Sequence, residues 1–329
     1  MCGGTGLDWT AVPPSFCRHN RFIQNCPICR APEPAPGAAK RPARSSSSRS
    51  AGSPARPARS SAVRVRQLTQ AADDGYRSEL VAGLKATADA ERLAGELAFA
   101  NARLEELAAD PPGLYADIAA LDDVEEALWL AFLVAYICPL NDEDDPFAAI
   151  RDAHVPWASG ELPRLDVARG PRSEADPATG ERTVLAYRAW AQRAGSQLAA
   201  FSGEQAWTPE RRFDRVFERL ALPGFGRPGR YELLVSLGRL GVVEVRPAAL
   251  KFTDDATTTA AKRVFGIGDT VLLERRARTL ADAVGLPIEA LDLALSNWGA
   301  RGRAERATYG SAAVVDEDER DAIAGVLGA

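Results

Sequence analysis

The segment from Ala127 to Cys138 constrains the fold more than any other part of this 329-residue chain. Every residue in it is hydrophobic, and four acidic residues within positions 122–126 suit the cap and first turn of a helix. A helix that is apolar on every side is stable only when other elements cover it completely. We therefore predict a helix at the centre of a helical domain, with Cys138 as a core thiol and not a nucleophile.

Extended to Leu140, this apolar run is still too short to span a bilayer. Residues 1–4 lack the charged and apolar regions of a signal peptide. A hydrophobic content of 46% and a net charge of −5 are ordinary for a globular protein. We expect a cytoplasmic protein that has no membrane partner.

The chain beyond residue 72 carries the helical pattern, in which apolar residues recur every three or four positions. Such stretches run from Leu80 to Leu107, from Thr183 to Phe201, from Phe213 to Leu220 and from Tyr231 to Leu237. Residues 242–245 predict a short β-like connection, and residues 155–180 a long loop or site lid. The fold class is therefore mainly α, with one multi-helix domain over residues 73–329.

A compact cluster of metal-ligand residue types lies near the start of the chain. Cys17 and His19 form a CxH pair, Cys26 and Cys29 form a CxxC pair, and six residues separate the two pairs. Two such chelating turns supply the four ligands of tetrahedral zinc without needing a hydrophobic core. We predict a structural zinc knuckle over residues 1–30; a disulfide or reduced free thiols are the alternatives.

A basic, low-complexity segment follows the knuckle. Residues 31–70 contain eight Lys or Arg against one Glu, among many Pro, Ala and Ser residues. Such a composition buries too little apolar surface to offset the entropy of ordering, so we predict a disordered linker over residues 31–72. A flexible basic arm is typical of proteins that bind DNA, although a plain solvated linker in an Arg- and Ala-rich protein is the alternative.

The stretch Leu222-Pro223-Gly224-Phe225-Gly226-Arg227 separates two of the predicted helices. Gly224 and Gly226 allow positive φ and leave backbone N–H groups open to an anionic oxygen, and Arg227 and Arg230 add positive charge. We predict a turn between helices that grips a phosphate backbone. A plain inter-helix turn is the alternative.

Two further segments contain polar residues that are candidates for a functional role. His154 is the one histidine outside the knuckle and suits acid–base work near neutrality, although a surface or core role is more common. The acidic run at 142–145 has oxygen ligands for a divalent cation, but a solvated loop is more common. Farther along, Asp254 or Asp255 suits the cap of a helix that ends at Gly266.

The order of these features resembles the helix-hairpin-helix superfamily of DNA base-excision glycosylases. Leu222, Pro223, Gly224 and Gly226 match its hairpin, and Asp254 precedes Arg263 by nine residues, as the aspartate of the family would. The resemblance covers roughly residues 211–299. It implies that the base is flipped out of the DNA stack and that an aspartate stabilises the cationic sugar.

Carried onto this chain, the resemblance makes Asp254 the first candidate for the catalytic aspartate and Asp255 the second. The residues expected to contact DNA are Leu222, Gly224, Gly226, Arg227, Arg230, Lys262 and Arg263. Pro228 stands where the lyase members have their Schiff-base lysine, so strand cleavage by that route is not expected. No cysteine follows Cys138, so the iron–sulfur loop of some members is absent.

A second, shorter resemblance is to the alpha-glutamyl/putrescinyl thymine pyrophosphorylases. These are helical families associated with thymine hypermodification in phage DNA, and they are proposed to replace pyrophosphate on a modified base. The similarity lies in Glu126–Leu133 and Leu291–Gly299.

Three hypotheses follow from the sequence. The first is a monofunctional, glycosylase-like enzyme that acts on a modified or damaged DNA base, with knuckle and arm holding the DNA. The second enzyme hypothesis is thymine hypermodification of the pyrophosphorylase type. The remaining alternative is a zinc-containing protein without catalysis that binds DNA or another protein.

Overall fold

The computed structural model describes residues 71–141 and 144–329, which all fall in one compact unit of the chain. These residues form helices and loops, with no strand among them, which confirms the mainly α prediction. The expected β-like connection at 242–245 is irregular backbone. The predicted zinc ligands, Cys17, His19, Cys26 and Cys29, and the basic linker lie outside the described residues.

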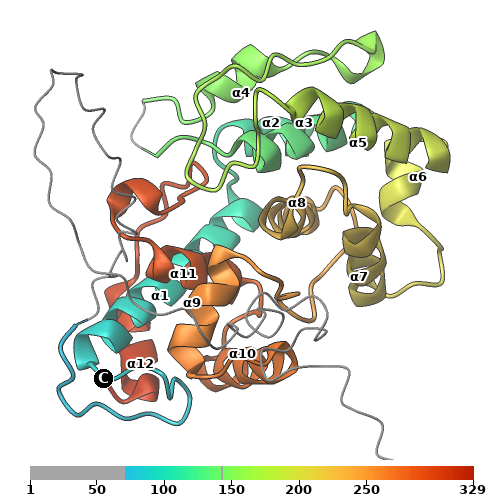
Figure 1. Cartoon of the computed structure of the whole chain (residues 1–329). Helices are drawn as coiled ribbons and strands as arrows, with labels where there is room; N and C mark the ends of the chain where they lie inside the picture. The colour runs from blue at the N-terminus through green and yellow to red at the C-terminus, as the bar shows by residue number, and fades with distance from the viewer. Residues whose placement is uncertain (1–70, 142–143) are drawn as a thin grey trace, which may run out of the picture. The chain divides into compact units, whose positions relative to one another are not determined.

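The longest connection between two successive helices follows α4, and long connections also follow α8 and α11 (Figure 1). In chain order they are α1 (Thr87–Ala109), α2 (Leu114–Ala120), α3 (Val124–Ile137), α4 (Ala148–Ala153), α5 (Gly180–Ala194), α6 (Gln197–Ser202), α7 (Pro209–Arg219), α8 (Arg227–Arg239), α9 (Ala256–Phe265), α10 (Thr270–Val284), α11 (Ala290–Gly299) and α12 (Glu317–Leu327). Short 3-10 turns lie at Trp157–Ser159 and Arg303–Glu305. Among the residues that the structure describes, no helix is long and apolar enough to cross a membrane.

Helix α3 is the buried centre that the sequence predicts. Asp123 caps it by accepting hydrogen bonds from the backbone N–H groups of Glu125 and Glu126, and every residue from Ala127 to Ile137 is buried. Helices α2, α4, α6 and α8 pack around it. Burial raises the pKa of Cys138 to about 12, which confirms a core thiol.

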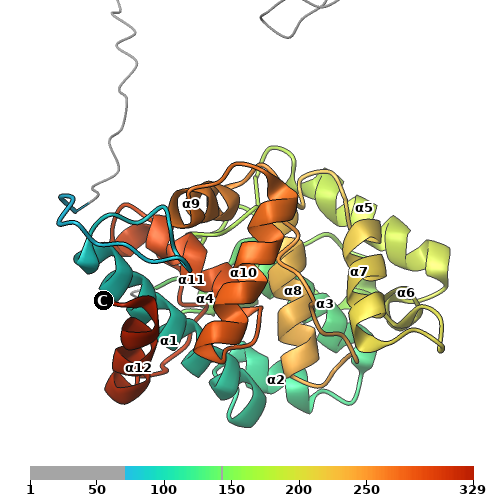
Figure 2. The same cartoon turned by 90° about the horizontal axis from the view of Figure 1, so that it is seen from below.

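A second group of helices surrounds α1. Helix α1 packs against α11 and α12, and α11 packs against α9 (Figure 2). Trp298 of α11 is buried here and donates its indole N–H to the carbonyl of Asp89, at 3.0 Å. The acidic segment from Asp316 to Asp321 forms the cap and first turns of α12, whose Ile323 and Leu327 are buried against this group.

The predicted amphipathic helix from Thr183 to Phe201 is wrong in two respects. The chain breaks at Gly195, where φ is 95°, and forms two helices, α5 and α6. Leu185 and Leu198, which belong to the apolar period of this stretch and would face the core in a single helix, are 50% and 42% exposed. The periodicity of the sequence puts both leucines on the apolar stripe of a single helix. Because the helix breaks after Ala194, the stripe of α5 does not continue onto α6.

The segment between α4 and α5 is the long loop that the sequence predicts. It is attached to the end of α3, because the backbone N–H of Gly170 donates to the carbonyl of Cys138 at 2.9 Å. The N–H groups of Glu174 and Ala175 both donate to the carbonyl of Tyr136, at 3.1 Å. These bonds fix residues 170–175 against the buried centre of the fold.

A buried ion pair joins the two helix groups. Arg103 of α1 and Glu232 of α8 have side chains that are 2% and 3% exposed, and they pair directly. Ser236 donates a further hydrogen bond to the Glu232 carboxylate at 3.0 Å. A charge buried this deeply is tolerated only with its partner in place.

We expect Glu232→Ala to lower the free energy of unfolding by about 3–5 kcal/mol, because it leaves the Arg103 charge buried without a partner. Urea unfolding measures the change. The matched control is Glu218→Ala, which breaks an exposed pair with Arg215 and is expected to cost less than about 1 kcal/mol. Equal effects of the two substitutions would contradict this account.

Candidate functional site

The turn between α7 and α8 is built into the core. Gly224 has φ of 73°, which suits glycine, and Phe225 is buried with its ring 5.2 Å from that of Phe132 on α3. Thr208 and Pro209 begin α7, with the Thr208 hydroxyl accepting from the Arg211 N–H. The turn is therefore held from inside by an aromatic contact.

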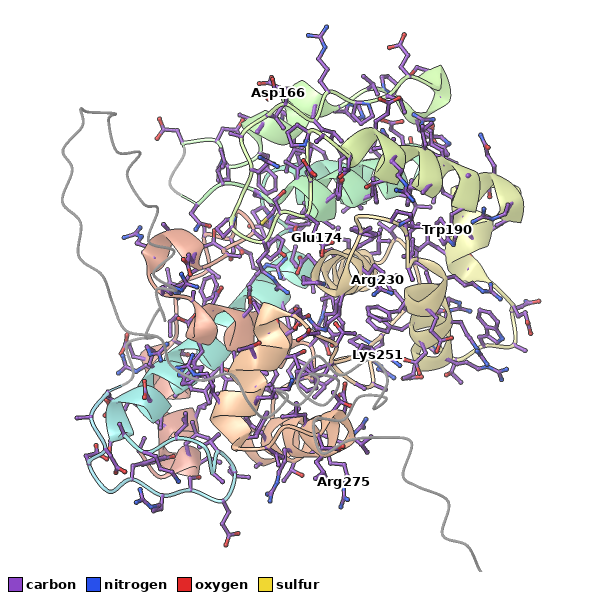
Figure 3. All side chains as sticks on the ribbon, in the orientation of Figure 1. Asp166, Glu174, Trp190, Arg230, Lys251 and Arg275 are labelled. Carbon is purple, nitrogen blue, oxygen red and sulfur yellow. The ribbon has the colours of Figure 1, made fainter. Side chains whose placement is uncertain are left out.

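The open N–H at the end of this turn binds a carboxylate of the same chain. Gly226 N donates to Oε2 of Glu174 at 2.9 Å. Figure 3 labels Glu174 beside α8 and near Arg230. A Cβ at Gly226 would lie 2.5 Å from Glu174 Oε1, and one at Gly229 would also collide with the carboxylate. Glycines at both positions therefore make room for Glu174.

The environment of Glu174 sets it apart from an ordinary surface acid. Burial raises its pKa, and the hydrogen bond from Gly226 and the charges of Arg172 and Arg230 oppose that effect without cancelling it. The resulting pKa is about 7, compared with an ordinary 4.5. Glu174 can therefore both accept and release a proton near neutral pH.

Glu174 lines a cavity of about 440 Å³. The walls come from loop residues 171–174, the start of α8 at Pro228, one face of α9, and the end of α11 with the residues after it. Polar side chains in the lining include Arg172, Ser173, Thr257, Thr259, Arg263 and Ser296. Such a hollow, with a few converging polar groups and an acid of shifted pKa, is typical of a binding or active site.

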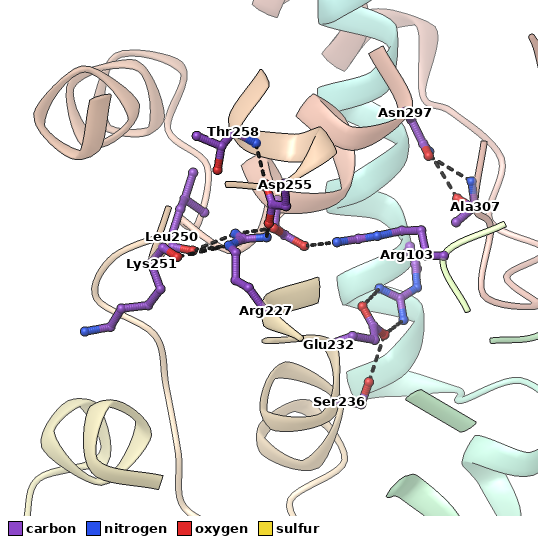
Figure 4. A network of polar contacts seen from close by, with 12 residues as sticks. Arg103, Arg227, Glu232, Ser236, Leu250, Lys251, Asp255, Thr258, Asn297 and Ala307 are labelled. Carbon is purple, nitrogen blue, oxygen red and sulfur yellow. Dashed lines mark hydrogen bonds and ion pairs between the residues drawn. The ribbon is translucent and has the colours of Figure 1, made fainter. Parts of the chain in front are cut away.

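A buried network of charges fixes one wall of this cavity (Figure 4). Asp292 of α11 accepts from Arg172 Nη2 at 2.9 Å and from Arg227 Nη2 at 2.5 Å. Burial raises the pKa of Asp292, but the two arginine charges outweigh it and hold the pKa below its usual value. The Nη1 atom of Arg172 is buried and has no hydrogen-bond partner among the described residues.

The two arginines predicted to contact DNA at the turn, Arg227 and Arg230, also make contacts within the fold. Arg227 is 2% exposed, and it also donates to the carbonyl of Leu250. Arg230 donates to the carbonyls of Phe217 and Gly226, at 2.9 and 3.1 Å. Both side chains thus support the turn from within. Of the other predicted contacts there, Gly224 is exposed and Leu222 half-buried.

The two predicted catalytic aspartates lie at the start of α9. Asp255 caps this helix by accepting from the Thr258 N–H at 2.7 Å, as the sequence indicates, and lies 3.4 Å from Arg227. Asp254 is exposed, and neither aspartate lines the cavity beside Glu174. Lys262 is half-buried, whereas Arg263 lines the cavity.

The other polar candidates are engaged within the fold. His154 Nε2 lies 2.5 Å from Glu126 Oε1, whose second oxygen accepts from the Trp157 N–H. Asp145, the last residue of the acidic run, pairs with Arg151. Within residues 71–141 and 144–329, no three His, Cys, Asp or Glu side chains are grouped so that they could hold a metal ion.

The sequence prediction missed Glu174, the residue that the geometry places at the centre of the site. Its signals were weak: it lies in the loop considered as a lid, and it precedes Gly226 by fifty-two positions. Nothing local to residues 171–174 indicates that the backbone of Gly226 will bind its carboxylate.

Comparison with known proteins gives one match. Residues 172–304 are similar to the family described as "Alpha-glutamyl/putrescinyl thymine pyrophosphorylase clade 3". The matched region, which is less than half of the chain, contains Arg172, Glu174, Arg263 and most of the cavity lining. It agrees with the second of the two resemblances in the sequence. No curated protein and no solved structure matches the chain.

The raised pKa of Glu174 predicts a specific dependence of stability on pH. The folded state holds this proton more tightly than the unfolded chain, so the contribution is complete below about 4.5 and is lost as pH rises through about 7. In urea unfolding, wild-type protein should lose stability relative to Glu174→Gln between pH 5 and pH 8, by at most about 3 kcal/mol.

Gln keeps an oxygen to accept the Gly226 N–H but cannot ionise. Glu181→Gln, which removes an exposed carboxylate from α5, is the control for the lost charge. A difference between wild type and Glu174→Gln that stays constant over this pH range would show that the pKa is not raised.

Proposed function

We propose that this protein is a DNA base-modifying enzyme of the thymine pyrophosphorylase type, with its active site in the cavity beside Glu174. The observation that carries the proposal is the position of this carboxylate. It lies in a hollow inside the region similar to the pyrophosphorylase family, and its pKa is about 7.

The family description defines the chemistry that such a site must support. It names a thymine that carries a glutamyl or putrescinyl group, together with pyrophosphate. The methyl carbon is the only saturated carbon of thymine, so a displacement on the base takes place there. The amine nitrogen forms a bond to this carbon, the carbon–oxygen bond to pyrophosphate breaks, and pyrophosphate leaves with the electron pair.

The residues of the cavity suit this displacement. An amine that attacks carbon must lose a proton, and the Glu174 carboxylate can accept it at neutral pH. Pyrophosphate carries negative charge, and the positively charged Arg172 is part of the lining of the same cavity. Glu174 is thus the proposed general base, and Arg172 a proposed ligand for the leaving group.

That the substrate is DNA is also part of the proposal. The predicted zinc knuckle, with Cys17, His19, Cys26 and Cys29 as ligands of structural zinc, and the basic linker would hold the nucleic acid. The glycosylase hypothesis shares this DNA substrate but assigns the chemistry to Asp254 or Asp255. The family match favours the pyrophosphorylase alternative, and the position of Glu174 gives that alternative a base.

We expect Glu174→Gln to reduce the displacement rate by roughly 10²–10⁴-fold, the usual contribution of a general base. The substrate is a DNA oligonucleotide bearing pyrophosphate on the methyl carbon of thymine, supplied with putrescine or glutamate. Released pyrophosphate gives the rate, and mass spectrometry of the digested nucleosides identifies the product. The wild-type rate should rise as pH increases through about 7, because the base acts in its ionised form.

Asp254→Asn is the matched comparison, since Asp254 is exposed and lies outside the cavity lining. Its rate should stay within about twofold of wild type. Formation of abasic sites that Asp254→Asn abolishes would instead establish the glycosylase mechanism. An unchanged rate in Glu174→Gln would exclude Glu174 as the base.

A further inference from the structure

A second cavity, of about 410 Å³, adjoins the first and has a strongly basic lining. Both cavities share Arg263, Ala300 and Arg301. The second is lined by five arginines and a single acidic side chain, Glu96. The arginines are Arg92, Arg263, Arg301, Arg303 and Arg306. The formal charge of the lining is therefore five positive against one negative, in a protein whose net charge is −5.

Two of these arginines converge on one aromatic ring. The guanidinium carbons of Arg92 and Arg263 lie 4.7 and 4.8 Å from the ring centre of Trp298. Burial lowers the pKa of Arg263, and the nearby charge of Arg92 lowers it further. Asp89 pairs with Arg92 at 3.0 Å and offsets part of this repulsion. The Trp298 ring thus holds two like charges close together at the wall of a hollow.

Arg306 and Arg301 add two further guanidinium groups to the lining. Arg306 Nη2 binds Glu96 at 2.9 Å, but its Nε atom is buried without a hydrogen-bond partner in the described part of the chain. The Arg301 side chain is exposed. The hydrogen bond from Arg301 to the Glu305 carboxylate is donated by the backbone N–H and not by the guanidinium group. Guanidinium groups that converge in this way match the oxygen atoms of a phosphate group.

We propose that this arginine-lined cavity binds phosphate oxygens, with Arg263 and Arg301 as ligands at the boundary between the two cavities. The phosphate is either free pyrophosphate or a phosphate of the DNA backbone. The first source rests on the proposed function, in which pyrophosphate leaves the base in the adjoining cavity. The binding itself does not require catalysis, because Glu174 does not line this second cavity.

Isothermal titration calorimetry of the full chain tests the proposal with two ligands, inorganic pyrophosphate and a short single-stranded oligonucleotide. Arg263→Gln and Arg301→Gln should each weaken binding by roughly tenfold or more, the usual effect of removing a charge-assisted hydrogen bond. Arg275→Gln removes an equal charge from the exposed face of α10, away from the cavity (Figure 3), and should leave binding unchanged. Thermal unfolding confirms that each variant is folded; Arg301 is exposed, so its variant remains informative if Arg263→Gln is unstable.

The two ligands separate the two sources of phosphate. Pyrophosphate binding that both variants weaken supports a site for the free anion. If only the oligonucleotide binds and the same variants weaken it, the site takes backbone phosphates. Affinities for both ligands that neither variant changes, or that Arg275→Gln changes equally, would overturn the proposal. Because binding is measured without turnover, a failure of Glu174 as the base leaves this result intact.

Discussion

The arrangement of the site depends on the two ion pairs that the buried carboxylate of Asp292 makes. One of its oxygens binds Arg172 of the long loop and the other binds Arg227 at the start of α8. Removing three charges from water is costly, and the pairing offsets that cost only if all three groups keep their geometry. The network therefore fixes the loop, α8 and α11 relative to one another, and with them the backbone that carries Glu174 two residues after Arg172.

The same arrangement changes the meaning of the Leu-Pro-Gly-x-Gly turn. In the sequence, the two glycines indicate an open backbone that can approach a phosphate. In the fold, Phe225 anchors the turn in the aromatic core around α3, and the Gly226 N–H holds the Glu174 carboxylate. Gly229, on the next turn, leaves the space that the carboxylate fills. The turn does present an N–H to an anion, but that anion is a side chain of the protein itself.

Local signals explain which features the sequence could predict. The apolar helix α3 and the caps at Asp123 and Asp255 each depend on residues close together in the chain, and all of them are confirmed. Glu174 could not be found in this way, because its environment is assembled from Gly226, Arg172 and the end of α3. The break at Gly195 was missed because the apolar period continues across it.

The arginine-lined cavity was hidden for a related reason. Its five arginines come from α1, α9 and the segment after α11, so no single stretch of the sequence contains all of them. A charge count along the chain finds the linker at 31–72 instead, where residues 31–70 contain eight basic residues against one acid. Only folding brings Arg92 and Arg263 onto the same indole ring.

The pKa of Glu174 follows from how the fold distributes its positive charge. A carboxylate beside Arg172 and Arg230 would ordinarily have a low pKa. Here Arg172 is already paired with Asp292, and Arg230 donates to two backbone carbonyls, so neither guanidinium is directed at Glu174 alone. Burial therefore has the largest effect on the pKa of Glu174 and raises it to about 7. The ion pairs that stabilise the fold thus leave one carboxylate in the cavity able to exchange a proton.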